Sequence, residues 1–424
     1  MILNHPFFHF RPRRVPGAAI RFKQTFGLGG AALILLILLF ASGLLLRLVY
    51  DPFPVKAYDS IVLFQNRLLF GRFIRNIHCW SANFLIAVVF LHLLRVVFTA
   101  GFFPPRHLNW YFGLLLWFTC LASSFTGYLL PWDQLAYWAV TICTGMLGTL
   151  PLVGEWLQEV FRGGDQIGAV TLRIFYTFHT ALLPALMLLL CGLHFWYIRK
   201  AGGIVFPRGL EETNGARGRT AISGQDLLRR ELMVSLVVIA AVFLVSALVD
   251  APLGDRANPG MSPNPAKAPW YFAGIQELLL LFHPILAILV IPALASAALI
   301  WLPFHSIAPG HIGIWFRSLK GRKLSLLSLV LSLLLTSAGI LHLDSIATTK
   351  TVSPDLAEIL TSSVLPFVLG VIGLVGYYLV LKRWLKAETD EAILAIITFL
   401  LVTYLVLSVS GIWFRGEGMA LVQP

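Results

Sequence analysis

The sequence predicts an all-α integral membrane protein with about nine transmembrane helices, on the basis of its composition and its long apolar stretches. Of the 424 residues, 58% are hydrophobic and only 12% are charged, whereas about 25% of residues in soluble domains are charged. A membrane-spanning helix requires about 20 mostly apolar residues. Stretches that approach this length, each bounded by charges, Pro or Gly, lie at residues 24–46, 76–98, 110–130, 174–198, 232–249, 276–302, 324–341, 361–381 and 392–411.

The basic residues predict the orientation of these helices. The chain carries 32 Lys and Arg residues against 20 Asp and Glu residues. Most of the basic residues fall into cytoplasmic segments when the N-terminus is placed in the cytoplasm, as the positive-inside rule requires. The basic residues form no stripe with interleaved aromatic residues, which argues against nucleic-acid binding. Four Cys residues without a C-x-x-C motif argue against a disulfide-stabilised scaffold.

The polar segments predict how the helices are grouped. Residues 1–23 form a predicted cytoplasmic segment ahead of the first apolar stretch. Residues 201–230 are polar, charged and rich in Gly, which is typical of a linker. This linker separates a front half of four helices from a back half of five. Residues 133–168 and 250–269 are predicted external loops, the second rich in Pro.

Four of the eleven histidines lie inside apolar stretches, in two pairs with similar spacing. His78 and His92 are 14 residues apart, which brings them within about 40° of one helix face and separates them by roughly 21 Å. His179 and His194 are 15 residues apart, within about 60° of one face and roughly 22 Å apart. Ionisable residues inside a membrane are costly and indicate function. For any one of them, a buried hydrogen bond to a neighbouring helix is the competing interpretation.

The two histidine-bearing helices run in the same direction across the membrane, because one helix lies between them in the alternating chain. The first histidine of each helix is therefore level with the first of the other, and the second with the second. Two such pairs on facing helices of a bundle form the arrangement that clamps a haem iron from both axial sides. We therefore predict a dihaem four-helix bundle in the N-terminal half.

Small and basic residues on the same helices fit this prediction. Two helices that flank the histidines each carry two glycines 14 residues apart, which would give a flat haem room to approach the backbone. Two arginines lie three residues from a histidine each, where they could pair with haem propionates. Ordinary small-residue helix packing and snorkelling to the interface are the competing interpretations. The residues concerned are Gly29, Gly43, Gly113, Gly127, Arg75 and Arg95.

The front half resembles cytochrome b of quinol-oxidising bc-type complexes, and above all the b6 type. The resemblance is nearly continuous from about residue 20 to residue 205. It implies that His78 and His179 hold an outer haem, and that His92 and His194 hold an inner one. The matching stretches are RNIHCWSANF at 75–84, LHLLRVVFTAGFFPPRHLNW at 91–110, FTGYLLPWDQLAYWAVTICTG at 125–145, LPLVGEWLQEVFRGGDQIG at 150–168, FYTFHT at 175–180 and HFWYIRKAGG at 194–203.

The back half resembles subunit IV of b6f complexes, fused here to the front half. The resemblance implies a domain order of a dihaem bundle at 24–200, the linker, and subunit IV-like helices with the outer quinone-site loop at 231–303. The C-terminal helices at 304–424 match only weakly. It also implies two non-covalent b-type haems with two His ligands each, and quinone as a further cofactor.

Two departures from the family bear on the chemistry. At the outer quinol-oxidation site, the family's proton-accepting Glu is replaced by Pro269, between Ala268 and Trp270. Glu277, two turns further along the chain, is a possible substitute, and a plain buried hydrogen bond is the alternative for it. The segment that attaches a covalent haem in b6f complexes contains no Cys here, at residues 26–30. We therefore expect no covalent haem.

The resemblance implies a subunit of a quinol:electron-acceptor oxidoreductase in a prokaryotic cytoplasmic membrane. It would carry electrons between outer and inner quinone sites, with proton translocation. Its partners would be a Rieske iron–sulfur protein and a c-type cytochrome, in a dimeric complex. Two alternatives remain: a dihaem conduit from an external redox protein to a single quinone site, and a haem-free transporter. Candidate quinone-site residues are Tyr137, Trp138, Trp270, Tyr271 and Glu277 outside, and Arg199 and Lys200 inside.

Overall fold

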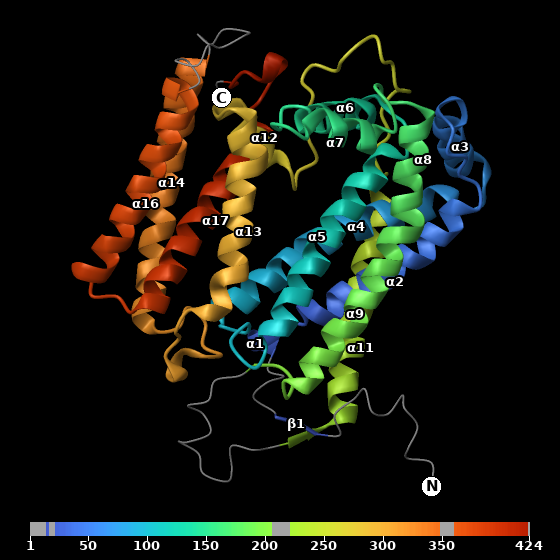
Figure 1. Cartoon of the computed structure of the whole chain (residues 1–424). Coiled ribbons are helices and arrows are strands. Elements are labelled where there is room, and N and C mark those ends of the chain that lie inside the picture. The colour runs from blue at the N-terminus through green and yellow to red at the C-terminus, as the bar shows by residue number, and fades with distance from the viewer. Residues whose placement is uncertain (1–13, 17–21, 206–220, 348–359, 423–424) are drawn as a thin grey trace. The chain divides into compact units, whose positions relative to one another are not determined.

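The computed structural model describes residues 14–16, 22–205, 221–347 and 360–422 (Figure 1). Within these ranges, nine helices are long and apolar enough to cross a membrane. The predicted fold class, an all-α integral membrane protein with about nine transmembrane helices, is confirmed. Most of the predicted cytoplasmic segment 1–23 and residues 206–220 of the predicted linker lie outside the described residues.

Each predicted apolar stretch has a helix in the structure. The bounds follow the sequence because charged or Gly residues flank most of the apolar runs. The spanning helices are α2 (Leu28–Arg47), α4 (Gly71–Phe98), α5 (His107–Leu129), α8 (Ala169–Thr177) continued by the π-helix η2 (Phe178–Leu182) and α9 (Leu183–Lys200), α11 (Gly224–Leu248), the π-helix η4 (Leu286–Val290) continued by α13 (Ile291–Trp301), α14 (Leu319–Ala347), α16 (Leu365–Arg383) and α17 (Thr389–Trp413).

One predicted stretch is wrong in its first part. Residues 276–302 do not form one helix, because α12 (Ala273–Leu281) ends before Phe282, whose backbone is extended. Pro284 follows, and proline has no N–H to continue a helical hydrogen-bond ladder. The membrane-spanning segment therefore begins only at Leu286.

Three π-helical turns share one feature of sequence. Each of η2, η4 and η7 (Leu360–Val364) is followed, two residues after its end, by a proline: Pro184, Pro292 and Pro366. A proline in a helix removes one hydrogen bond and clashes with the preceding turn. A π-turn, with its i→i+5 hydrogen bonds, relieves that clash by accommodating an additional residue.

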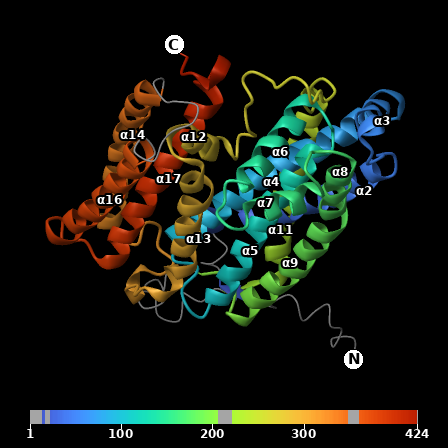
Figure 2. The same cartoon turned by 45° about the horizontal axis from the view of Figure 1, so that its top comes forward.

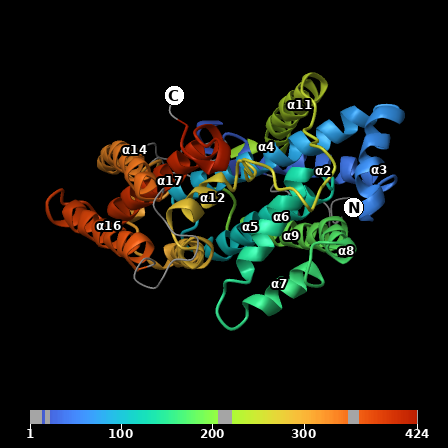
Figure 3. The ribbon, with the colours of Figure 1, turned by 90° about the horizontal axis from the view of Figure 1, so that it is seen from above.

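The chain divides into two compact units. The first contains the described parts of Met1–Ala136, Arg162–Ala257 and Pro309–Ile314. In it, α2 packs against α4, α5 packs against α9, and α11 packs against both α2 and α4 (Figures 1 and 3). The first unit thus places α11 with the four front helices, although α11 follows the predicted linker.

Two side chains fix α11 to the start of α4. Asn76 donates to the carbonyl of Ser246 at 2.9 Å and accepts from the amide of Ala251 at 2.8 Å. Arg75 donates to the carbonyls of Ala251 and Pro252 at 2.9 and 2.6 Å. Both side chains are buried. Smaller elements of the first unit are α1 (Phe22–Thr25), α3 (Pro54–Arg67), the 3-10 turn η6 (Pro309–His311) and an antiparallel pair of strands, β1 (Arg14–Pro16) and β2 (Ala221–Ser223).

The second unit contains the described parts of Tyr137–Phe161, Asn258–Ala308 and Trp315–Pro424. Its centre is α17, which packs against α12, α14 and α16 (Figures 1 and 2). Buried hydroxyls join these helices: Ser332 on α14 donates to the carbonyl of Phe399 on α17 at 2.8 Å. The remaining elements are α6 (Gln134–Leu147), which starts at the boundary between the units, α7 (Gly154–Arg162), and the 3-10 turns η5 (Leu302–Phe304) and η8 (Glu417–Met419).

Candidate functional site

The first histidine pair consists of His78 on α4 and His179 on η2. Their ring centres are 6.2 Å apart and the ring planes are inclined by 76°. An imidazole–metal bond is about 2 Å long, so this separation leaves room for one metal atom between two ring nitrogens. The Nδ1 atom of each ring already has a partner: the hydroxyl of Ser42 at 2.9 Å for His78, and the carbonyl of Ser123 at 2.9 Å for His179.

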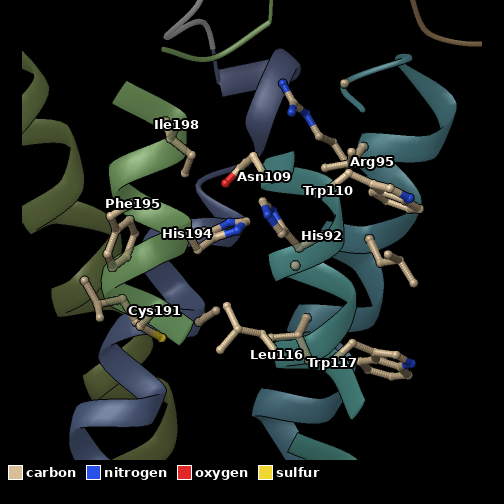
Figure 4. Close-up of a pocket in the computed structure, with 18 of the residues that line it drawn as sticks. His92, Arg95, Asn109, Trp110, Leu116, Trp117, Cys191, His194, Phe195 and Ile198 are labelled. Carbon is tan, nitrogen blue, oxygen red and sulfur yellow. The ribbon is translucent and has the colours of Figure 1, made fainter. Parts of the chain in front are cut away.

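The second pair consists of His92 on α4 and His194 on α9. Figure 4 shows the two rings turned toward one another across a pocket. The pocket has a volume of about 200 Å³ and apolar walls from α2, α4, α5 and α9, among them Leu116 and Trp117. Because His78 meets His179 and His92 meets His194, the two helices run in the same direction. The predicted level-by-level pairing agrees with this geometry.

The π-helical turn explains the unequal histidine spacing. In a regular α-helix, steps of 14 and 15 residues differ by about 100° in direction. In η2, however, the amide of Leu183 bonds to the carbonyl of Phe178, five residues earlier. This turn accommodates one additional residue, so the 15-residue step from His179 to His194 matches the 14-residue step on α4. The signal in the sequence was Pro184, which lacks the N–H that a regular α-helix needs at this place.

The four predicted glycines each face a different histidine. A Cβ atom added to Gly127 would lie 2.4 Å from Cε1 of His179, and one on Gly43 would lie 3.1 Å from Cε1 of His78. For the second pair, the distances to Cε1 are 3.4 Å from Gly113 to His194 and 3.7 Å from Gly29 to His92. The glycines therefore let the imidazole rings lie against the backbone of α2 and α5. Any side chain at Gly127 would displace the ring.

The two predicted arginines lie in different surroundings. Both terminal nitrogens of Arg75 donate to loop carbonyls, as described above. Arg95 lines the pocket at the second pair, where its Nε donates to the carbonyl of Gln24 at 2.9 Å. Its buried Nη2, and the buried Oδ1 of Asn109 on the same pocket, have no hydrogen-bond partner within the described part of the chain. Arg95 is thus free to bind an anionic group in the pocket.

Together these features fit a haem at each histidine pair. Each pair offers two imidazoles. In the first pair, an Nδ1 hydrogen bond fixes the orientation of each ring, as is usual for ligated imidazoles. Glycine backbones line both pairs, and the pocket at the second pair holds an unpaired guanidinium nitrogen that matches a propionate. Most of the side chains that line the pocket at the second pair are apolar, as a haem plane requires.

The candidate outer quinone residues lie in the second unit. Trp270 and Tyr271 precede α12, with ring centres 5.5 Å apart, and Trp270 is 41% exposed. Glu277 is fully buried, and its carboxylate forms an ion pair with Arg415. Tyr137 is buried on α6 beside Trp138. Arg415 could not be found from the sequence alone, because nothing in the spacing of residues 277 and 415 links them.

The candidate inner residues end α9. Arg199 and Lys200 are exposed in the last turn of that helix. The ammonium group of Lys200 lies 5.7 Å from the ring centre of Tyr197, in a cation–π contact. Tyr197 in turn stacks on Phe112 of α5 at 5.1 Å. These contacts anchor the basic end of α9 beside α5 and leave Arg199 open to an anionic or carbonyl ligand.

Comparisons with known proteins agree on one family. The family model described as Cytochrome b/b6/petB matches residues 17–202. Cytochrome b6 of Prochlorococcus marinus is 39% identical over 175 residues, which cover 41% of this chain and 80% of that protein. Cytochrome b6 of Synechococcus elongatus is 41% identical over 175 residues, covering 41% and 81%.

A solved structure extends the similarity to the back half at the level of fold. A chain of a hyperthermophilic respiratory Complex III superposes with a TM-score of 0.65, covering 91% of this chain and 90% of its own. At 22% sequence identity this match concerns the fold alone. The sequence relatives, which this chain covers over about four fifths of their length, carry the assignment. The chain is a multi-pass membrane protein that belongs to the cytochrome b/b6 family.

Proposed function

We propose that this protein is the dihaem cytochrome b subunit of a quinol-oxidising complex, and that it carries electrons across the membrane between an outer and an inner quinone site. The observation that carries the proposal is that the chain has two histidine pairs at different depths, and that two glycines face the rings of each pair. In this proposal, His78 and His179 hold the outer b-type haem, and His92 and His194 hold the inner one. Bound haem iron would supply reversible one-electron transfer.

The chain's own residues contribute orientation and environment. Ser42 and the carbonyl of Ser123 fix the Nδ1 sides of the first pair, which leaves Nε2 of each ring for the metal. The apolar walls of the pocket at the second pair would keep water away from a bound haem. Arg95 would pair with a propionate through its free Nη2. Arg75 already donates to two carbonyls, so any contact to a propionate would use its remaining N–H groups.

The quinone sites and partners follow from the family and stay proposals. Trp270, Tyr271, Tyr137 and Glu277 would form the outer site, and Arg199 with Lys200 would serve the inner one. A Rieske iron–sulfur protein and a c-type cytochrome would accept the other electron, in a dimeric complex of a prokaryotic cytoplasmic membrane with the N-terminus inside. The domain order 1–23, 24–200, 201–230, 231–303 and 304–424 belongs to the same proposal.

A second candidate function is a dihaem conduit from an external redox protein to one quinone site. Pro269 and the ion pair of Glu277 with Arg415 favour the conduit, because proline cannot accept a quinol proton and the carboxylate of Glu277 is already paired. One experiment separates the two functions. With the inner site inhibited, quinol should still reduce the outer haem if the outer site oxidises quinol. No reduction by quinol, together with reduction by an external protein donor, would select the conduit.

The haem assignment has its own test. Acid–acetone extraction followed by a pyridine haemochrome assay of the purified subunit should give two extractable b-type haems per chain. A stoichiometry of one, or haem that remains attached to the chain, would contradict the proposal.

A further inference from the structure

Glu277 and Arg415 form a buried, two-point ion pair in the second unit. The exposed fraction is 0% for Glu277 and 3% for Arg415. Nε of Arg415 donates to both carboxylate oxygens at 3.1 Å, and its Nη2 also donates to Oε1. The hydroxyl of Ser410 adds a third donor at 3.3 Å. Planar, bidentate pairing of this kind fixes geometry more strictly than a point charge does.

The C-terminal half of α17 also holds the loop that precedes α12. The hydroxyl of Tyr404 donates to the carbonyl of Tyr271 at 2.8 Å. The ammonium group of Lys267 donates to the carbonyl of Ile412 at 3.0 Å. These two bonds lie on either side of Pro269 and Trp270. The loop that carries the candidate quinone-site aromatics is therefore tied at both ends to the helix that leads into Arg415.

Close packing makes this contact rigid. A Cβ atom at Gly274 would lie 2.6 Å from the ring of Tyr404 and 2.7 Å from the hydroxyl of Ser408. On α12 itself, the side chain of Gln276 bridges the loop: it accepts from the amide of Ala268 and donates to the carbonyl of Ala266, both at 2.7 Å. Gln276 and Glu277 are neighbours, so one short segment of α12 binds the loop and the ion pair together.

We propose that Arg415 is a positioning residue for the outer quinone site: through Glu277 it holds α12 and α17 in register and thereby fixes the loop at residues 266–271. This inference rests on the proposed function. Buried ion pairs are weak sources of stability, but removal of one partner leaves an uncompensated buried charge. Glu277 is thus part of a clamp, and its carboxylate accepts a quinol proton only if the pair breaks.

The primary test is hydrogen exchange of the loop, which needs no quinol. In the purified full-length holoprotein, peptides that cover residues 266–272 should exchange at least about tenfold faster in Arg415→Met than in the wild type, because the loop's bonds open more often. Arg415→Lys keeps the charge but not the bidentate geometry, and its exchange should be intermediate. The matched control is Arg229→Met, which breaks an exposed pair with Asp226 and should leave the loop unchanged.

A double variant distinguishes positioning from general damage. Glu277→Leu combined with Arg415→Met removes the clamp without leaving a buried charge unpaired. Exchange of the loop should therefore stay faster than in the wild type, whereas a return to the wild-type rate would assign the effect of Arg415→Met to the uncompensated charge and overturn the positioning role. If Arg415→Met does not fold, Arg415→Lys and the double variant still decide the question. Exchange at the wild-type rate in both Arg415 variants, or full rescue of exchange by lysine alone, would overturn the proposal.

Quinol kinetics connect the clamp to the site. In Arg415→Lys the KM for quinol should rise by about tenfold while kcat changes less, as expected when a binding loop is misplaced. An unchanged KM with a loosened loop would overturn the link to the quinone site. A wild-type protein that reduces no haem with quinol would reject the proposed function instead, and the exchange result would stand independently of it.

Discussion

The π-helical turn at residues 178–182 predicts that one residue can be removed between His179 and His194 without loss of the second histidine pair. We consider the variant that lacks Leu182 and carries Pro184→Ala. The deletion removes the additional residue that the turn accommodates, and the substitution restores the N–H that a regular helix needs at this place. The result would be an uninterrupted α-helix in which the second histidine follows the first after 14 positions, the same step that α4 has.

The magnitude follows from helix geometry. Deletion of one residue from a regular α-helix rotates everything beyond it by about 100° and shortens the helix by about 1.5 Å. In α4, which has no π-turn between His78 and His92, deletion of Val88 must therefore turn His92 away from His194. On the other helix the same deletion only removes the bulge. We expect two haems per chain after deletion of Leu182 with Pro184→Ala, and one after deletion of Val88.

The assay is the haem count per chain in detergent-purified protein, by pyridine haemochrome, with reduced-minus-oxidised spectra to identify low-spin haem. Pro184→Ala alone is the control and should retain two haems. Loss of a haem from the deletion variant, while Pro184→Ala keeps both, would refute the idea that the π-turn equalises the two steps. Retention of both haems after deletion of Val88 would refute the geometric argument itself.

Three further outcomes are expected. His179→Ala should remove only one haem and His194→Ala only the other, because the rings pair level by level; a variant that keeps both low-spin spectra would disprove the pairing. Gly127→Ala should lower haem content far more than Gly29→Ala. The Cβ added at residue 127 would lie 2.4 Å from the ring of His179, whereas the Cβ added at residue 29 would lie 3.7 Å from the ring of His92. The reverse order would contradict the proposed role of the glycines in making room for the rings. Burial, and after it the nearby Arg317, lower the pKa of His305. The unfolded chain therefore takes up a proton at higher pH than the folded chain, and stability is lost as pH falls below about 6.5. His305→Gln should reduce the fall in Tm between about pH 7.5 and 5.5, and an unchanged fall would assign that fall to other groups.

The front half shows how far sequence reasoning reaches for a membrane protein. Apolar length alone located the helices, because the bilayer thickness sets that length. The histidines and glycines repeat at intervals of 14 or 15 residues, so their faces and levels followed from helix geometry. Side-chain partners such as Ser42 and Ser123 did not follow, because they depend on how α2 and α5 are rotated about their axes. Rotation is set by packing between helices, which leaves little trace in the local sequence.

The back half shows where that reasoning ends. The break after Leu281 was missed because the apolar pattern continues through His283 and Pro284, although Pro284 gave a local warning. The partner of Glu277 was missed for a different reason. Arg415 is 138 residues away in the sequence, and only the fold brings the two together. Long-range polar contacts of this kind require the structure.

The carboxylates of the candidate outer region bear directly on which function the protein performs. Glu277 is engaged by Arg415 and Ser410 within the second unit. In the first unit, the two oxygens of Asp133 accept the amides of Ala136 at 2.9 Å and Gly254 at 3.0 Å. Each of these carboxylates therefore already serves a structural contact. A general base must reach the proton directly or through one water, and a base already held in a buried ion pair performs that task only by giving up its partner.

The proton acceptor is consequently the point on which the two proposed functions divide. If this chain oxidises quinol, either the ion pair at Glu277 opens during turnover or a partner subunit supplies a carboxylate beside Trp270. In the first case Glu277→Gln strongly slows quinol-dependent haem reduction, and the remaining rate loses one limb of its pH profile, while both haems stay bound. In the second case that variant changes KM through the loop but preserves the pH profile. If the wild type shows no quinol-dependent haem reduction, the protein is the conduit. Its electrons then enter from a protein donor, and it needs no proton route at the position of Pro269.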